Sequence, residues 1–168
     1  MLRFREAAVT DADAHALLIA YFAERAAGFP VEQGVYRPTF PMPEQFEPPA
    51  GVFLIVDAAD ADGDDPTAPA NTPLGCGGVR RIPPSADGLV RYEVKHLWLR
   101  PEARGSGGGR MLLQELERRA VAFGAQELVL DTNASLEAAG GLYHASGYVP
   151  IEPYNDNPNA TNWYGKRV

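Results

Sequence analysis

The stretch from Arg100 to Arg110, RPEARGSGGGR, places four glycines and three arginines between a strand-like run and a helix-like pattern. A glycine-rich turn at such a position lets several backbone N–H groups converge on one anion, and the dipole of the following helix adds partial positive charge. Side chains in the turn would obstruct that approach. The stretch therefore predicts a binding site for the phosphate groups of a ligand.

Two common phosphate-binding motifs fit this stretch poorly. The nucleoside triphosphate loop requires G-x-x-x-x-G-K-[ST], and neither a lysine nor a hydroxyl residue follows these glycines. The dinucleotide motif G-x-G-x-x-G fails at its third glycine, which would be Arg110 or Leu112 depending on where the motif starts. Asp131 lies at a suitable distance along the chain to bind a ribose, so a dinucleotide ligand stays open as an alternative.

Composition restricts the class of protein. The chain has 168 residues, of which 45% are hydrophobic and 22% charged, as expected for a single domain over residues 1–168. A net charge of −7 argues against a nucleic-acid partner, and no apolar run is long enough to cross a membrane. Cys76 is the only cysteine, so we expect no disulfide and no metal site. The N-terminal segment lacks signal-peptide features, which favours a cytoplasmic protein.

Charge is distributed unevenly along the chain. Between Arg91 and Arg119, seven lysine and arginine residues stand against four glutamates, so a small anionic ligand is compatible with the negative total. Acidic residues concentrate instead in DAADADGDDPTAPANTP, from Asp57 to Pro73, which we expect to be a loop between two strands.

Hydrophobic periodicity predicts the elements that position the glycine-rich stretch. We expect strands at residues 2–9, 51–58, 74–82, 89–100, 127–132, 148–151 and 161–168, and helices at residues 109–126 and 135–147. Another helix is expected after Thr10, which would cap it, with Leu17, Leu18 and Phe22 on its apolar face. The proline-rich segment 28–50 is expected to be either a loop that covers the substrate or a connector. The strand–helix–strand order from Glu93 to Asp131 makes its two strands parallel, with a right-handed crossover.

Arg104 to Gly109 reads R-x-x-G-x-G, and here the sequence resembles the GCN5-related N-acetyltransferase (GNAT) family, whose pyrophosphate-binding signature is Q/R-x-x-G-x-G/A. The resemblance extends from EVKHLWL, which begins at Glu93, to AAGGLYHASGY, which ends at Tyr148. It implies a GNAT-like α/β (α+β) fold: a mixed, mostly antiparallel sheet of six to seven strands with helices on both faces. In that fold the parallel fourth and fifth strands splay apart at a bulge.

The resemblance implies acetyl-CoA as the cofactor, with its pantetheine arm between the splayed strands. Main-chain groups around Leu97, Trp98 and Leu99 would bind the pantetheine amides. Backbone N–H groups from Arg104, Gly105, Ser106, Gly107, Gly108 and Gly109 would bind the pyrophosphate, and the side chains of Arg104 and Arg110 would add charge-assisted contacts. Asn133 is a further candidate, because Leu136 stands where many relatives carry a CoA-binding asparagine.

Acetyl transfer to an amine requires two proton movements. An amine with a pKa of about 10 must lose a proton before it attacks a thioester, and the departing thiolate needs a proton or a hydrogen bond. The resemblance implies Glu93 as the base, acting through water, and Tyr143 in GLYHASGY as the acid. Because Glu93 and Lys95 share a strand face, an ordinary ion pair is the competing interpretation of Glu93.

The resemblance places the acceptor between the first helix and its following loop, the hairpin of the third and fourth strands, and the last strands. The candidate residues there are Phe29, Tyr36, Phe40, Arg80, Arg81, Tyr154, Asn155, Asp156 and Trp163. An arginine beside an acid could hold the carboxylate and ammonium of an amino-acid-like substrate. We therefore expect a small amine as acceptor, since no peptide-binding domain is appended. A peptide acceptor, an acyl-CoA sensor without turnover, and a homodimer all stay open.

Overall fold

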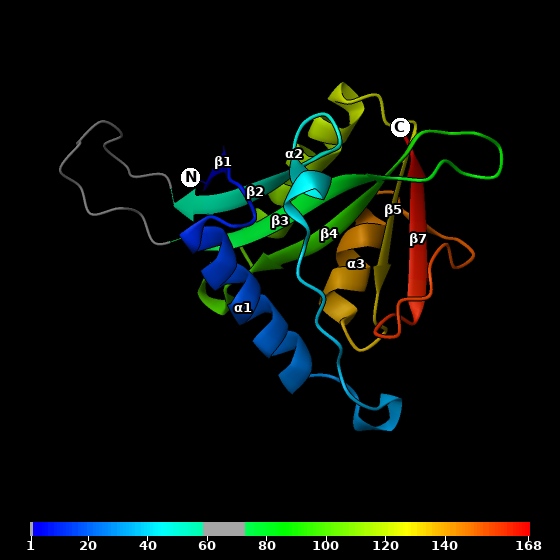
Figure 1. The fold of residues 1–168 in the computed structure, drawn as a ribbon. Helices are drawn as coiled ribbons and strands as arrows, with labels where there is room; N and C mark the ends of the chain where they lie inside the picture. The colour runs from blue at the N-terminus through cyan, green and yellow to red at the C-terminus, as the bar shows by residue number, and fades with distance from the viewer. Residues whose placement is uncertain (1, 59–72) are drawn as a thin grey trace, which may run out of the picture.

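The computed structural model describes residues 2–58 and 73–168 (Figure 1). Its strands (β), α-helices (α) and short 3-10 helices (η) are, in chain order, β1 (Leu2–Glu6), α1 (Ala12–Ala27), η1 (Val31–Gln33), η2 (Pro43–Phe46), β2 (Gly51–Ala58), β3 (Pro73–Ile82), β4 (Arg91–Leu99), η3 (Pro101–Ala103), α2 (Gly108–Ala122), β5 (Glu127–Thr132), α3 (Glu137–Ala145), β6 (Val149–Pro150) and β7 (Asn162–Arg167). Most of the acidic stretch expected to be a loop, residues 59–72, lies outside the described residues.

The strands of the described chain form one mixed sheet in the order β1-β2-β3-β4-β5-β7-β6. β4 and β5 pair in parallel, whereas the other neighbouring strands pair antiparallel. This arrangement confirms the expected fold, including the parallel fourth and fifth strands. A dinucleotide fold would require an open, mostly parallel sheet, so that alternative is wrong.

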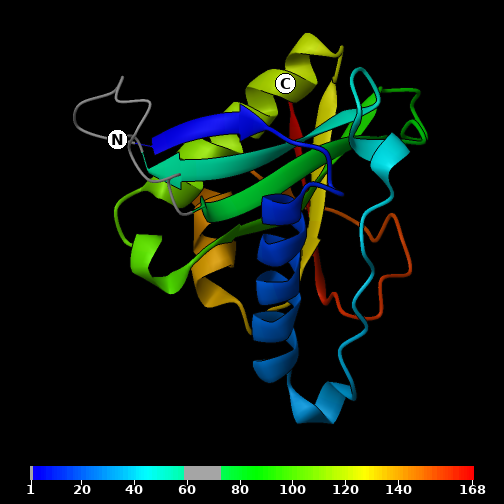
Figure 2. The same cartoon turned by 60° about the vertical axis from the view of Figure 1, so that its left-hand side comes forward.

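Helices cover both faces of the sheet, as Figures 1 and 2 show from two directions. Side chains of β2 alternate between the faces, as the pleat of a strand dictates. Phe53 and Ile55 pack in the cluster that contains α1, whereas Val52, Leu54 and Val56 pack in the cluster that contains α2 and Tyr143 of α3. Burial of each such side chain contributes roughly 1.5–3 kcal/mol, so both layers fix the position of the sheet.

β4 contains a bulge in its pairing with β3. Gly78 pairs with Lys95 and Cys76 pairs with Trp98, so β4 has one residue more than β3 across this interval. His96 lies in the bulge with a φ of 55°, in the left-handed region that residues other than glycine seldom adopt. The expected bulge is therefore present in β4.

The bulge exchanges the faces of the sheet to which side chains of β4 point. Before it, Tyr92 and Val94 pack in the cluster with α2. After it, Leu99 packs in that cluster and Trp98 packs in the cluster with α1. Before the bulge the side chains of even-numbered residues face α2, and after it those of odd-numbered residues do, because the extra residue shifts the alternation by one.

β4 and β5 diverge just before the bulge. Their main chains pair only from Arg91 with Glu127 to Glu93 with Val129. Beyond Glu93 the two strands separate, and their arrowheads lie apart in Figure 1. The divergence confirms the splayed strands that the resemblance implied.

The cap of the first helix differs from the expectation. Asp11, not Thr10, is the N-cap of α1, and its carboxylate accepts hydrogen bonds from the backbone N–H groups of Asp13 and Ala14. Both residue types cap helices well, but the Asp11 side chain reaches two of the orphan N–H groups, so the helix begins one residue later. None of the helices in residues 2–58 and 73–168 is both long and apolar enough to span a bilayer.

Candidate active site

A cavity of about 660 Å³ lies between α1, the diverging ends of β4 and β5, the loop 155–160, and the proline-rich residues 28–50, which we call the strap. Its lining includes Tyr21, Phe22 and Arg25 of α1, Phe29, Tyr36, Phe40 and Gln45 of the strap, Arg80, Lys95 and His96 of β3 and β4, and Asp131, Asn133, Tyr143, Asn155 and Asn159 on the β5 side. The strap therefore forms part of the cavity wall, as a covering loop would.

The structure brings some of the expected acceptor residues to the cavity and leaves others outside it. Phe29, Tyr36, Phe40, Arg80 and Asn155 line the cavity. Arg81 and Asp156 are exposed and do not line the cavity. Because side chains alternate along a strand, Arg81 points to the opposite face of β3 from Arg80. Tyr154 and Trp163 lie behind the wall and bond to residues of the site.

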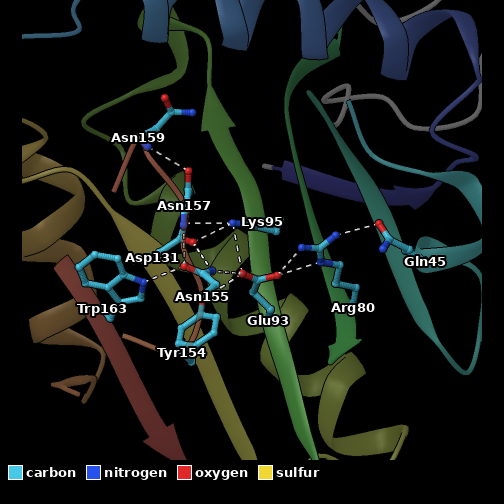
Figure 3. A network of polar contacts seen from close by, with 10 residues as sticks. All are labelled: Gln45, Arg80, Glu93, Lys95, Asp131, Tyr154, Asn155, Asn157, Asn159 and Trp163. Carbon is cyan, nitrogen blue, oxygen red and sulfur yellow. Dashed lines mark hydrogen bonds and ion pairs between the residues drawn. The ribbon is translucent and has the colours of Figure 1, made fainter. Parts of the chain in front are cut away.

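Glu93 is the centre of a buried polar network, drawn in Figure 3. The Arg80 Nε atom lies 2.8 Å from Oε2, and the Lys95 Nζ atom lies 3.2 Å from Oε1. The Tyr154 hydroxyl and the Asn155 amide also donate to Oε1, at 3.0 and 3.4 Å. The expected ion pair with Lys95 is present. Glu93 is only 1% exposed and does not line the cavity itself. Its carboxylate is connected to the cavity by its contacts with Arg80, Lys95 and Asn155, which do line it.

Asp131 lies opposite Lys95 and lines the cavity. The Lys95 Nζ atom donates to both carboxylate oxygens, at 3.0 and 3.1 Å, and Asn155 Nδ2 donates to Oδ2 at 2.7 Å. Burial by itself would raise the pKa of the Asp131 carboxyl, but the Lys95 ammonium and the hydrogen bonds from Asn155 and Asn157 hold that pKa below its ordinary value. Asp131 is therefore ionised at neutral pH.

Aromatic residues form the wall on the α1 side. The His96 ring lies 5.7 Å from the ring centres of Tyr21 and Phe22. Burial, with the charges of Lys95 and Arg80, lowers the pKa of His96 to about 3, so this histidine is neutral at physiological pH. Burial raises the pKa of the Tyr21 hydroxyl to about 12. These aromatic residues thus add no charge to the wall.

Tyr143 lines the cavity from α3 and is 7% exposed. Its ring packs against those of Tyr148 and Tyr164, at centroid distances of 6.0 and 6.3 Å. Burial raises the pKa of the Tyr143 hydroxyl to about 12, and the positive charge of Arg25 opposes part of that rise. The hydroxyl therefore stays protonated at neutral pH and can donate a hydrogen bond.

The glycine-rich turn leads directly into α2. Gly105 and Gly107 have φ values of 83° and 85°, and Gly107 is the N-cap, with no side chain capping the helix. Within the described chain, no backbone N–H from Gly105 to Arg110 donates a hydrogen bond to protein. The first N–H groups of a 15-residue helix are thus free to bind an anion.

The two arginines of this turn have different surroundings. Arg104 Nε donates to the carbonyl of Leu99 at 2.9 Å, and Nη2 donates to both carboxylate oxygens of Glu24, at 2.8 and 2.7 Å. Arg104 therefore fastens the turn to β4 and to α1. Arg110 is exposed in the first turn of α2.

Main-chain groups of β4 face the gap at alternate residues. The Arg100 N–H donates to the Leu74 carbonyl on β3, and Trp98 pairs with β3 two residues earlier. Alternation then directs the main-chain groups of Leu97 and Leu99 away from β3 and toward the gap. The main-chain groups of Trp98 face β3 and are not free to bind the pantetheine amides. Of the three expected residues, Leu97 and Leu99 therefore keep main-chain groups directed toward the gap.

Asn133 lines the cavity but uses its amide within the protein. Its Nδ2 donates to Gln33 Oε1 at 2.7 Å and to the Asn159 carbonyl at 3.0 Å, and its Oδ1 accepts from the Ser135 N–H at 3.0 Å. Both amide hydrogens are therefore engaged, and Asn133 ties the strap to the loop 155–160. No group of three or more His, Cys, Asp or Glu in the described part of the chain could hold a metal ion.

Comparison with known proteins places the chain among acetyltransferases. Residues 13–148 match the model of the Acetyltransferase (GNAT) family. An uncharacterized N-acetyltransferase of Schizosaccharomyces pombe is 35% identical over 114 residues, which make up 68% of this chain and 61% of that protein.

Solved structures share the fold. A GNAT-family acetyltransferase from Staphylococcus aureus superposes with a TM-score of 0.71 over 99% of each chain, at 13% identity. A GNAT-family acetyltransferase from Elizabethkingia anophelis with acetyl-CoA bound superposes with a TM-score of 0.61 at 11% identity, over 99% of this chain and 98% of that one. At these identities the likeness concerns the fold alone.

Proposed function

The chain belongs to the acetyltransferase (GNAT) family, and from this premise we propose that it transfers an acetyl group from acetyl-CoA to the amine of a small molecule. One observation carries the proposal: the gap between β4 and β5 opens on the cavity, and Arg104 of the glycine-rich turn bonds to Glu24 in the cavity wall. An anion site, a slot for an extended chain and a chamber for an acceptor are the parts that such a transfer requires.

Acetyl-CoA, when bound, supplies the thioester that an amine attacks. Leu97 and Leu99 would offer main-chain groups to the pantetheine amides at the open edge of β4, as a strand offers them to an added strand. Backbone N–H groups from Gly105 to Arg110 would bind the pyrophosphate at the helix N-terminus. The left-handed backbone of Gly105 and Gly107, which glycine adopts without strain, supports this role, because the N–H groups of this turn make no hydrogen bond to the described protein.

An acceptor amine must lose a proton before it attacks, so the site needs a proton acceptor within reach of the cavity. We assign the role of proton acceptor to Glu93, reached through the Lys95 ammonium, because Lys95 lines the cavity and its Nζ atom lies 3.2 Å from Oε1. Lys95 would pass a proton to Glu93 and take one from the amine. Glu93 would thus act through its neighbours and not by direct contact.

Tyr143 would stabilise the departing sulfur. Its pKa of about 12 lies several units above that of an ordinary thiol, about 8.5, so complete proton transfer to the thiolate is uphill. A hydrogen bond from the hydroxyl to the developing thiolate needs no such transfer and still stabilises the transition state. We therefore propose that Tyr143 acts as a hydrogen-bond donor.

The strap favours a small acceptor over a peptide. The Arg37 N–H donates to Asn159 Oδ1 at 2.9 Å, and Asn159 Nδ2 donates back to the Arg37 carbonyl at 2.8 Å. Asn133 makes a second link, through Gln33. Arg37, Asn133 and Asn159 all line the cavity, so these links join the strap to the loop 155–160 in the cavity wall and would restrict access for an extended chain.

Thermal unfolding with acetyl-CoA, CoA, NAD or ATP at equal concentrations, combined with a free-thiol assay in the presence of small amines, tests the proposal. We expect stabilisation by acetyl-CoA and CoA alone, and thiol release that depends on an amine. Stabilisation without thiol release for any amine would identify an acyl-CoA sensor and overturn the proposal. Stabilisation by NAD alone would overturn the cofactor assignment.

A further inference from the structure

Arg25, in the last turn of α1, brings to the cavity a guanidinium with N–H donors that make no hydrogen bond to the described residues. Its Nε and Nη1 atoms are buried and have no hydrogen-bond partner in the described part of the chain. Its Nη2 atom lies 3.8 Å from Glu24 Oε1, beyond hydrogen-bond distance, and both oxygens of Glu24 already accept from Arg104. Buried N–H donors without acceptors cost free energy, which an anionic ligand would recover.

The other partly buried cations of the cavity, Arg80 and Lys95, are already paired. Arg80 donates to Glu93 through Nε and to Gln45 Oε1 through Nη1, each at 2.8 Å. Lys95 contacts both Glu93 and Asp131. The sequence pattern suggested that an arginine on β3 holds an acceptor carboxylate, but Arg80 has little hydrogen-bonding capacity left. Arg25 has the free capacity.

The surroundings of Arg25 hold it in position and place it near the proposed chemistry. Its guanidinium carbon lies 5.6 Å from the centre of the Tyr21 ring, a cation–π contact that restricts the side chain. Its charge acts on the hydroxyls of both Tyr36 and Tyr143. Arg25 and Tyr143 both line the cavity, so an anion bound by Arg25 would share it with Tyr143, the proposed donor to the departing sulfur.

We propose that Arg25 binds a carboxylate of the acceptor, so that the substrates are small amines that also carry a carboxylate group, as amino acids do. This inference rests on the proposed function and adds the substrate class to it. Guanidinium and carboxylate groups match in shape and charge, and the cavity walls around Arg25 exclude much of the solvent that would weaken their interaction.

Matched pairs of acceptors test the proposal: a panel of amino acids against their carboxamides, with acetyl-CoA, wild-type protein, Arg25→Gln and Arg25→Lys. We expect Arg25→Gln to raise KM for the carboxylate acceptors by about 10- to 100-fold, the effect of losing a hydrogen bond to a charged group. The KM for acetyl-CoA should not change. The kcat/KM for the carboxamides should fall much less than that for the carboxylates, because only the charge of Arg25 near Tyr143 is lost. Arg25→Lys should recover part of the loss. Arg118→Gln, on an exposed arginine of α2, is the matched control.

Protein stability separates binding from a structural role. Because the Nε and Nη1 atoms of Arg25 make no hydrogen bond within residues 2–58 and 73–168, Arg25→Gln should unfold close to the wild-type temperature in the absence of ligand, with only the contact to the Tyr21 ring lost. A marked fall in that temperature would overturn the proposal, since it would show that Arg25 already has stabilising partners.

The remaining outcomes are distinguishable. Equal use of carboxylates and carboxamides by wild type, or a parallel rise in the KM for acetyl-CoA in Arg25→Gln, would overturn the role of Arg25 and leave the proposed function standing. Calorimetric titration of amino acids into the CoA-loaded protein adds a readout independent of turnover. Binding that Arg25→Gln abolishes, without acetylation, would support the carboxylate site and overturn the proposed function. No binding to wild type would overturn the carboxylate site.

Discussion

Lys95 on β4 and Asp131 on β5 form a largely buried ion pair, with Nζ 3.0 Å from Oδ1, two residues beyond the last main-chain pair of their strands. That last pair joins Glu93 and Val129. Side chains therefore continue the connection between the strands where the backbones diverge. The ion pair closes the narrow end of the gap proposed to hold the pantetheine arm, and it links that gap to the network around Glu93.

Asp131→Asn should destabilise the fold, because it removes one partner of a largely buried ion pair. Such changes typically cost 3–5 kcal/mol, and since Glu93 still contacts Lys95 we expect about 3 kcal/mol in urea unfolding at pH 7. Asp87→Asn, in an exposed pair with Arg167, is the control and should show no measurable loss. Equal losses for both variants would contradict the importance of the buried pair.

The same carboxylate should make stability depend on pH. The folded state holds the pKa of Asp131 below its ordinary value, about 3.9, so the unfolded state takes up a proton first as pH falls. The stability from Asp131 is complete above that ordinary pKa and is lost as pH falls through the folded pKa. The difference in unfolding free energy between wild type and Asp131→Asn should thus shrink below about pH 4. A difference that is constant with pH would argue against it.

Glu93→Gln should reduce kcat/KM most strongly at low pH. A proton acceptor typically contributes 10²- to 10⁴-fold, but it becomes dispensable as pH approaches the pKa of the amine, about 10, where the free amine is already present. We expect at least a 10²-fold loss at pH 7 that diminishes toward pH 10. If the loss is the same at every pH, Glu93 supports the site only through its ion pairs with Arg80 and Lys95.

Tyr143→Phe should lower kcat by about 10- to 100-fold, the value of a hydrogen bond to a charged group, and leave acetyl-CoA affinity unchanged. The substitution keeps the aromatic packing against Tyr148 and Tyr164. Tyr164→Phe, whose hydroxyl lies outside the cavity wall, is the control for loss of a neighbouring hydroxyl. Pre-steady-state thiol release and calorimetric binding separate the two effects. Unchanged kcat would exclude Tyr143 from the reaction.

Gly107→Ala should weaken acetyl-CoA binding about tenfold or more, because the left-handed backbone that directs the N–H groups outward is unfavourable for alanine. Gly124→Ala is a matched control at the other end of α2, where φ is 94°. Both variants should lose about 1 kcal/mol of stability. Only Gly107→Ala should alter acetyl-CoA affinity, measured by calorimetry, and equal effects on affinity would contradict the anion site.

Local features of this fold follow from the sequence. The change from alternating to helical periodicity around Arg110 identifies the strand–helix–strand unit and thus the parallel pair β4 and β5. The pairing of Glu93 with Lys95 was also predictable, since residues two apart share a strand face. Asp131, in contrast, meets Lys95 only through the register of β4 and β5, which periodicity does not specify.

The cavity wall is held together by contacts between residues far apart in the sequence, which local sequence patterns do not predict. Asn133 meets Gln33 across 100 residues of chain, and Asn159 meets Arg37 across 122. Arg25 reads in the sequence as an ordinary basic residue near a helix end, where it complements the helix dipole. The structure is needed to show that two of its N–H groups make no hydrogen bond to the described chain, because the neighbouring Glu24 bonds to Arg104, 80 residues away.

Mass-spectrometric detection of an acetylated amine tests the central claim most directly. The purified protein is incubated with acetyl-CoA carrying an isotopic label in the acetyl group and with a panel of small amines. We predict one labelled acetyl group on an amine, with release of an equal amount of CoA, and strong loss of both in Tyr143→Phe. Binding of acetyl-CoA without any labelled product across the panel would contradict the account.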